Sequence, residues 1–283
     1  MGKLNLQTVI DPDSGFCFGV VEAINKAEHA IEQGNELFCL GEIVHNDEEV
    51  SRLSKRGMKT INHQELGNLK NKTILFRAHG EHPKSYKTAI DNSNKIIDAS
   101  CPIIKKLQQK VKTSYHNNEF IIIFGKPDHP EVIALNGQVD DKALIVEKID
   151  DININSIPDK ITIYSQTTQS IEKFYEIVDY LKQANKDITV KDTICRRVSN
   201  RHPRLQKFCR MYSKVIFVGG KRSSNAKVLF DVCSKENTNA YFISRPEEIH
   251  PEWFSEGEIV GISGATSTPH WLMEKVSDFI KTL

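Results

Sequence analysis

The sequence predicts an α/β protein built mainly from parallel sheets, and three observations support this fold class. Of the 283 residues, 39% are hydrophobic and 27% are charged, which is the composition of an ordinary water-soluble globular protein. Short β-branched or aromatic runs alternate with helical patterns from one end of the chain to the other. Most of the strand candidates are nearly continuous apolar runs, as expected for strands covered by helices on both faces.

Each predicted strand is a short apolar, β-branched or aromatic run bounded by turn residues. In chain order, the predicted strands cover residues 37–40, 73–76, 95–98, 119–124, 143–147, 161–164, 187–190, 214–218, 240–243 and 258–262. Helical patterns fill the gaps between them, for example over residues 20–33, 102–116, 171–182 and 225–233. This alternation favours strands joined by helical crossover connections.

Three cysteines divide the chain into thirds. Cys17, Cys101 and Cys195 are separated by about a third of the chain each, and each lies at the front of a helical pattern. We therefore expect three similar α/β lobes. They would cover residues 14–97, 98–193 and 194–283, with residues 1–13 packed on the third or the first lobe. The sequences of the thirds are too dissimilar to demonstrate a repeat, so this expectation depends on the placement of strand, cysteine and helix.

Charge and hydropathy bear on location and partners. The 38 Lys and Arg residues nearly balance 37 Asp and Glu, so the net charge of +1 gives no global field that attracts nucleic acid or an anionic membrane. No apolar run approaches the roughly 20 residues that span a bilayer. The N-terminus also lacks the apolar core of a secretory signal. We expect a cytoplasmic protein that binds neither nucleic acid nor membrane and keeps its six cysteines reduced.

The same three cysteines are candidate metal ligands. Cys17 lies between two glycines, Cys101 precedes a proline suited to the first position of a helix, and Cys195 follows a predicted strand. A helix N-terminus stabilises a thiolate. Three widely spaced thiolates do not match the usual tetrahedral zinc site, but they suit a cubane iron–sulfur cluster with one iron left open. The alternative for any cysteine is a small buried hydrophobic residue. That alternative is our interpretation of the remaining three, Cys39, Cys209 and Cys233.

Hydroxyl, amide and imidazole groups follow several predicted strands and indicate an anionic ligand. Ser223, Ser224 and Asn225 open one helix, and Ser267 begins the turn that opens another, so both loops offer N–H and side-chain donors to a phosphate. The alternative is that these residues are simply helix N-caps. The three histidines at strand ends are His45, His79 and His129. Two donor loops together with three histidines favour a diphosphate.

One carboxyl group is a candidate proton donor. Glu131 lies two residues after His129, at the start of a predicted helix, and could deliver a proton. The alternative is that it stabilises the helix dipole. Lys221 and Arg222 could join the anion site, but we interpret them as a solvated basic pair.

The sequence resembles the 4-hydroxy-3-methylbut-2-enyl diphosphate reductase family in the order of its motifs, over nearly the whole chain. The motifs that carry the resemblance are residues 15–20 (Gly-Phe-Cys-Phe-Gly-Val), 44–46 (Val-His-Asn), 77–80 (Arg-Ala-His-Gly), 98–102 (Asp-Ala-Ser-Cys-Pro), 129–132 (His-Pro-Glu-Val), 166–168 (Gln-Thr-Thr), 223–225 (Ser-Ser-Asn) and 267–269 (Ser-Thr-Pro). Two segments differ from the family pattern. The segment after Cys195 is more basic, and residues 263–264 read Ser-Gly.

The resemblance implies three α/β lobes around a central [4Fe-4S] cluster, one per chain. It implies the last step of the methylerythritol phosphate route to isoprenoids. In that step, two electrons and protons remove an allylic hydroxyl as water and give isopentenyl and dimethylallyl diphosphates. The implied electron donor is a ferredoxin or a flavodoxin. The implied cluster ligands are Cys17, Cys101 and Cys195. The implied diphosphate-binding residues are His45, His79, His129, Ser223, Ser224, Asn225 and Ser267. Thr167 would lie near the substrate hydroxyl, and Glu131 would relay the proton.

Three other functions use part of this residue set. An iron–sulfur hydro-lyase would also need three cysteines and an open iron, but its carboxylate substrate calls for arginines at the strand ends. A cluster-bearing redox sensor would need the cysteines and would have no use for Glu131, Thr167 or two phosphate loops. A structural zinc protein would lack the brown colour of a cluster. The sequence favours the reductase over these alternatives.

Overall fold

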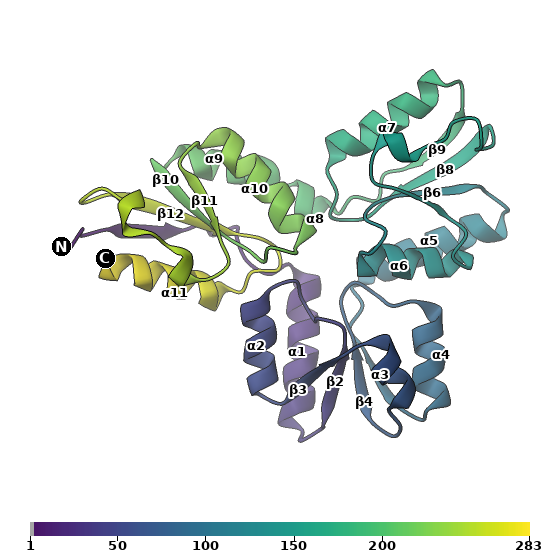
Figure 1. Ribbon diagram of the computed structural model, residues 1–283, viewed down its shortest axis with the longest axis horizontal. Coiled ribbons are helices and arrows are strands. Elements are labelled where there is room, and N and C mark those ends of the chain that lie inside the picture. Colours follow the sequence, from purple (N-terminus) through teal and green to yellow (C-terminus); the bar gives the residue numbers. More distant parts are fainter. Residues whose placement is uncertain (1–2) are drawn as a thin grey trace. The chain divides into compact units, whose positions relative to one another are not determined.

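The computed structural model describes residues 3–283, in which parallel strands alternate with helices (Figure 1). The strands are β1 (Gln7–Ile10), β2 (Leu37–Leu40), β3 (Met58–Ile61), β4 (Thr73–Phe76), β5 (Lys95–Asp98), β6 (Ile121–Phe124), β7 (Leu144–Val146), β8 (Lys160–Ser165), β9 (Asp187–Lys191), β10 (Lys214–Val218), β11 (Ala240–Ile243) and β12 (Ile259–Gly264). They form three parallel sheets of four strands each.

The α-helices fill the connections between strands. They are α1 (Phe18–Glu32), α2 (Asp47–Lys55), α3 (His63–Asn68), α4 (Pro83–Asp91), α5 (Pro102–His116), α6 (Pro130–Asn136), α7 (Ile171–Gln183), α8 (Arg196–Ser199), α9 (Arg201–Arg210), α10 (Ser224–Glu236) and α11 (His270–Thr282). Single 3-10 turns cover η1 (Gly137–Val139), η2 (Ile149–Asp151), η3 (Pro246–Glu248) and η4 (Pro251–Trp253). No helix within residues 3–283 combines the length and apolar character needed to cross a membrane.

The chain divides into two compact units. The first holds the residues up to Val21 together with 44–56 and 196–283, and the second holds 22–43 and 57–195. The sheet of the first unit has the order β1-β12-β10-β11. Alternate residues of β10 face opposite sides of this sheet, since Ile216 packs in a cluster with residues of α11 while Phe217 packs in a cluster with residues of α9 and α10.

The second unit contains the other two sheets, with the orders β3-β2-β4-β5 and β7-β6-β8-β9. In the latter, Ile122 packs in a cluster with residues of α7, whereas Ile123 packs in a cluster with residues of α5 and α6. Figure 1 shows α7 on one face of this sheet and α5 with α6 on the other. Burial on both faces explains why the central strands read as continuous apolar runs.

The structure confirms the predicted α/β class, its parallel sheets and its three lobes. All ten predicted strands are present, and two more were missed, β1 and β3. Both are four-residue edge strands with partly exposed side chains, so neither has the continuous apolar run that marked the others. β1 pairs with β12, which joins the start of the chain to the sheet of the C-terminal third. The lobe boundaries given above stay a prediction.

Candidate active site

The three cysteines predicted as ligands occupy equivalent places in the three sheets. In each sheet one edge strand, β1, β5 or β9, runs into a loop that ends in one of these cysteines, directly before a helix. In each case the backbone N–H of the cysteine donates to a carbonyl in the loop that follows the neighbouring strand. The pairs are Cys17 with Thr266 at 3.2 Å, Cys101 with Ala78 at 3.0 Å, and Cys195 with Thr167 at 2.9 Å. The repeat that the sequence could not demonstrate is therefore present in the topology.

The six cysteines fall into two classes by exposure. Cys39, Cys209 and Cys233 are fully buried, as expected, and burial raises the pKa of the Cys39 thiol to about 12. The other three cysteines are half-buried. Cys101 is the N-cap of α5, and its thiol makes no capping hydrogen bond there. Half-buried thiols at helix starts are the donor set that an iron–sulfur cluster requires, so these residues fit such a group.

A buried carboxyl group lies beside the Thr167 hydroxyl in the second unit. Glu131 is in the first turn of α6 and is 1% exposed. The Thr167 N–H donates to Glu131 Oε1 at 2.6 Å, and the Thr167 hydroxyl donates to Oε2 at 2.8 Å. Burial raises the pKa of the Glu131 carboxyl to about 7, although both hydrogen bonds favour the ionised form. This group can therefore hold or release a proton near neutral pH.

Two of the predicted histidines meet near this carboxyl group. His129 is the N-cap of α6, and its Nδ1 accepts from the backbone N–H of Glu131 at 3.1 Å. A neutral His129 ring therefore carries its proton on Nε2. The His79 ring packs edge-on against it, with the ring centroids 5.5 Å apart. The structure thus brings His79, His129, Glu131 and, through Glu131, Thr167 into one cluster.

The hydroxyl and amide residues form a second polar cluster at the start of α10 in the first unit. The Ser223 and Ser267 hydroxyls lie 3.1 Å apart, and Ser223 caps α10 by accepting from the Ala226 N–H at 3.2 Å. Both serines and Ser224 are buried. A helix N-terminus lined by buried hydroxyls is suited to an anion.

Asn225 completes this cluster, and its amide orientation is fixed by Thr266. Its Oδ1 accepts from the Thr266 N–H at 2.9 Å and from the Thr266 hydroxyl at 2.6 Å. The Nδ2 donor of Asn225 is buried and has no hydrogen-bond partner within residues 3–283. A buried donor without a hydrogen-bond partner costs free energy of folding, and an acceptor atom of a bound ligand would satisfy this one. Apart from its place next to Ser267, nothing in the sequence pattern indicates this role of Thr266.

His45 belongs to the first unit and lies against the turn that leads into α10. A Cβ on Gly220 would come within 1.9 Å of the His45 carbonyl oxygen, so only glycine allows the two backbones to approach this closely. Asn46, the next residue, caps α2. His45 is therefore held at the turn before Ser223 by a backbone contact.

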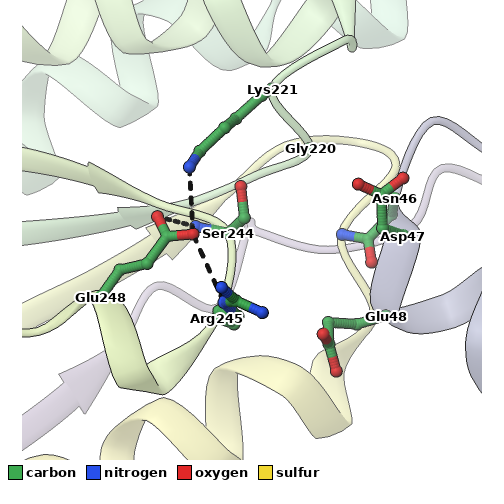
Figure 2. A pocket seen from close by; sticks show the side chains of 8 residues that line it. All are labelled: Asn46, Asp47, Glu48, Gly220, Lys221, Ser244, Arg245 and Glu248. Atoms are coloured by element: carbon green, nitrogen blue, oxygen red, sulfur yellow. Dashed lines mark hydrogen bonds and ion pairs between the residues drawn. The ribbon is translucent and has the colours of Figure 1, made fainter.

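The basic pair next to this turn is solvated, as expected. Lys221 and Arg222 are exposed and form ion pairs with Glu248 and Asp47. A pocket of about 230 Å³ lies on this side of the turn. Figure 2 shows the side chains that line it. Glu248 accepts from Lys221 at 3.1 Å and from the Ser244 N–H at 3.2 Å, so the charge of Lys221 is paired within the pocket. None of the residues predicted for the site lines it.

Sequence reasoning missed a half-buried, inward-pointing arginine at the Cys17 loop. The Arg201 guanidinium donates to the Gly264 carbonyl at 2.7 Å and to the Gly15 carbonyl at 3.5 Å. It therefore ties the loop that ends in Cys17 to the end of β12. A helical basic segment carries no sequence signal that one of its cations points inward.

Fold and site together define a parallel α/β enzyme with a buried carboxyl group of raised pKa and a helix N-terminus lined by buried hydroxyls. A family model described as LytB protein matches residues 9–281. The 4-hydroxy-3-methylbut-2-enyl diphosphate reductase of Bacteroides fragilis is 46% identical over 96% of this chain and 96% of its own, and that of Chloroherpeton thalassium is 40% identical over 96% and 95%. The chain belongs to the LytB family, whose relatives here are named as this reductase.

Solved structures lead to the same family. A structure of (E)-4-hydroxy-3-methyl-but-2-enyl diphosphate reductase, described as the terminal enzyme of the non-mevalonate pathway, is 33% identical, with a TM-score of 0.74 over 98% of this chain and 99% of that one. The reductase from Plasmodium falciparum is 27% identical, with a TM-score of 0.83 over 98% of this chain and 88% of that one. Similarity over whole chains agrees with the three-sheet architecture.

Proposed function

We propose that this chain reduces (E)-4-hydroxy-3-methylbut-2-enyl diphosphate to isopentenyl diphosphate and dimethylallyl diphosphate. The reaction consumes two electrons and two protons: the allylic C–O bond breaks, the oxygen leaves as water, and a C–H bond forms. The observation that carries the proposal is the buried Glu131 carboxyl group, hydrogen-bonded to the Thr167 hydroxyl and able to exchange a proton near pH 7. The names of relatives that are up to 46% identical support the choice of substrate.

We propose that Cys17, Cys101 and Cys195 bind one [4Fe-4S] cluster. Their support is their half-buried thiols and their equivalent places at the ends of edge strands. When bound, the cluster would supply electrons one at a time and an iron without a protein ligand, which can act as a Lewis acid on the hydroxyl group. A cytoplasmic location, which we also propose, would keep these thiols reduced.

The diphosphate would be bound by the hydroxyl, amide and imidazole residues. Asn225 offers a buried Nδ2 donor, and Ser223 and Ser267 offer hydroxyls at the start of α10. We assign the same role to Ser224, His45, His79 and His129. The serine and asparagine side chains are neutral, so they would bind and orient the anion through hydrogen bonds.

Proton delivery would run from Glu131 through Thr167. Thr167 Oγ1 and Glu131 Oε2 lie 2.8 Å apart. When Glu131 is protonated, this hydrogen bond reverses: the carboxyl O–H donates to the Thr167 oxygen, and the hydroxyl passes its own proton to the substrate hydroxyl. The oxygen then leaves as water. Burial of both side chains excludes solvent from this path.

A one-electron carrier must supply the electrons, and we propose a ferredoxin or a flavodoxin. Both are small acidic proteins that deliver electrons singly. No residue described above stores two electrons, so the donor is a separate molecule.

The test is anaerobic purification with iron and acid-labile sulfide analysis, followed by turnover with dithionite-reduced methyl viologen. We expect about four irons per chain, activity lost in Cys17→Ser, and a fall of about 10²–10⁴ in kcat for Glu131→Gln. Thr167→Ser keeps the hydroxyl and should retain much more activity than Thr167→Val. Zinc in place of iron, or full activity in Glu131→Gln, would contradict the proposal. Water loss from the substrate without any reductant would identify a hydro-lyase instead.

A further inference from the structure

The positive charge of this nearly neutral chain is concentrated in one segment. Residues 193–230 contain ten Lys and Arg residues and no Asp or Glu, although the net charge of the whole chain is only +1. The first part of this segment forms α8 and α9, directly after Cys195. Ion pairs to carboxylates outside the segment involve five of the ten cations, namely Arg204, Arg210, Lys214, Lys221 and Arg222. The excess of positive charge that remains creates a field that attracts an oppositely charged partner.

Apart from Arg201, the cations of α8 and α9 lie on the side of these helices that faces solvent. Leu205 and Cys209 of α9 pack in the core against β10. Arg197, Arg204 and Lys207, at helical spacings of seven and three residues, are exposed. We call this exposed set, Arg197, Arg204 and Lys207, the basic face. Met211, 63% exposed, continues it by one turn as an apolar group.

The basic face borders an opening that reaches Cys17. A pocket of about 450 Å³ is lined by residues 12–18, which include Cys17, and by Arg197, Asn200, Arg201, Arg204 and Thr266. Its three arginines face one carboxylate, that of Asp13. In the first unit, a proposed ligand of the iron–sulfur cluster, Cys17, therefore lies beside a positively charged surface.

Two of these cations are held in place at the edge of the pocket. The Arg197 guanidinium lies 4.6 Å from the centroid of the Phe18 ring, next to Cys17 in the chain. Arg204 forms a 2.7 Å ion pair with Asp13 and is still 67% exposed. Cations held in fixed positions lose less conformational entropy when a partner binds than freely moving ones do.

We propose that the basic face is the docking site for an acidic one-electron carrier protein, which approaches the cluster at the Cys17 loop. This inference rests on the proposed function, because it names the surface through which that reaction receives its electrons. Charge complementarity selects an acidic partner. The polar residues at the start of α10 are proposed to bind the diphosphate of the substrate, so the basic face is not needed for substrate binding.

The experiment compares two charge reversals with a matched control. Arg197→Glu and Lys207→Glu reverse cations of the basic face, while Lys173→Glu reverses an exposed cation on α7, outside it. Binding of flavodoxin to the holoenzyme is titrated at low and high salt, and turnover is measured with reduced flavodoxin and with reduced methyl viologen. Lys207→Gln, which only removes a charge, serves if a reversal impairs folding.

We expect each reversal to weaken flavodoxin binding and raise its KM about tenfold at low salt, because charges at the rim of an interface act mainly on encounter. High salt should reduce the difference between variant and wild type, and turnover with methyl viologen should not change. The docking site would be overturned if Arg197→Glu and Lys207→Glu bound flavodoxin as tightly as the control Lys173→Glu does. It would also be overturned if the two reversals lost as much turnover with methyl viologen as with flavodoxin. A wild-type protein that binds no iron would contradict the proposed function instead, and the binding titration would still decide the docking site.

Discussion

At the scale of single residues, the Glu131 carboxyl group combines full burial with hydrogen bonds from both the backbone and the hydroxyl of one threonine. Burial raises the pKa and the hydrogen bonds lower it, and burial dominates, since the pKa rises from 4.5 to about 7. The native protein therefore binds a proton between these two pH values that the unfolded chain does not. The stability contributed by this group is fully present below pH 4.5 and is lost as the pH rises through 7.

This raised pKa predicts a pH-dependent effect of Glu131→Gln. The amide keeps the shape without the charge, so the variant should gain stability relative to wild type between pH 5 and pH 8, by roughly 3 kcal/mol. Urea unfolding at the two pH values measures the difference. Glu172→Gln, on an exposed carboxyl of α7, is the control. A difference in unfolding free energy that does not change with pH would show that Glu131 is already ionised at pH 5.

A second residue-scale prediction concerns Asn225. Asn225→Asp keeps the two acceptor contacts to Thr266 but replaces the buried Nδ2 donor by a second carboxylate oxygen. A negative charge at this point repels an anion, so the affinity for inorganic pyrophosphate should fall at least about tenfold, or 1.4 kcal/mol. Isothermal titration of the holoenzyme measures it. Unchanged affinity would remove Asn225 from the anion site.

At the scale of elements, the turn between β10 and α10 depends on the absence of a side chain at Gly220. Gly220→Ala would place a Cβ against the His45 carbonyl oxygen, and a backbone atom cannot move aside as a flexible side chain can. We expect a loss of roughly 1–3 kcal/mol in stability together with weaker pyrophosphate binding, because the turn positions Ser223.

The matched control for this turn is Gly67→Ala on α3, where an added Cβ meets nothing within 4 Å. There alanine should stabilise the protein by about 0.5–1 kcal/mol through its higher helix propensity. Thermal unfolding of both variants measures the contrast. Equal Tm values for the two would show that the close approach at Gly220 has no energetic consequence.

At the scale of the whole molecule, a half-buried cysteine follows one edge strand of each of the three sheets, while the other three cysteines are fully buried. The two groups of thiols should therefore differ in reactivity. In protein freed of metal under anaerobic, non-denaturing conditions, Cys17, Cys101 and Cys195 should react with a thiol reagent, whereas Cys39, Cys209 and Cys233 should react only after unfolding. Reconstitution with iron and sulfide should protect the first three. Mass spectrometry of the labelled peptides identifies them, and protection of Cys39 alone would contradict the ligand set.

The amino-acid sequence was enough to predict the α/β class and the buried strands, and it supplies most of the residues proposed for the site. It could do so because parallel strands covered on both faces must be apolar runs, and because polar residues at their carboxyl ends stand out against that pattern. Glu131 and Asn225 were found in this way, whereas Thr167 was assigned through the family resemblance. The short edge strands β1 and β3 were not, since half-exposed strands carry mixed residues.

Only the tertiary structure decided how these groups act on one another. Thr167 contacts Glu131 across 36 positions of the chain, and Thr266 fixes Asn225 across 41. The raised pKa of Glu131 and the unpaired Asn225 donor depend on burial, which is a property of the packed neighbours and not of the residue type. Pairing of β1 with β12 likewise joins the two ends of the chain. No local pattern encodes such contacts, because their energy is gained only when distant segments pack together.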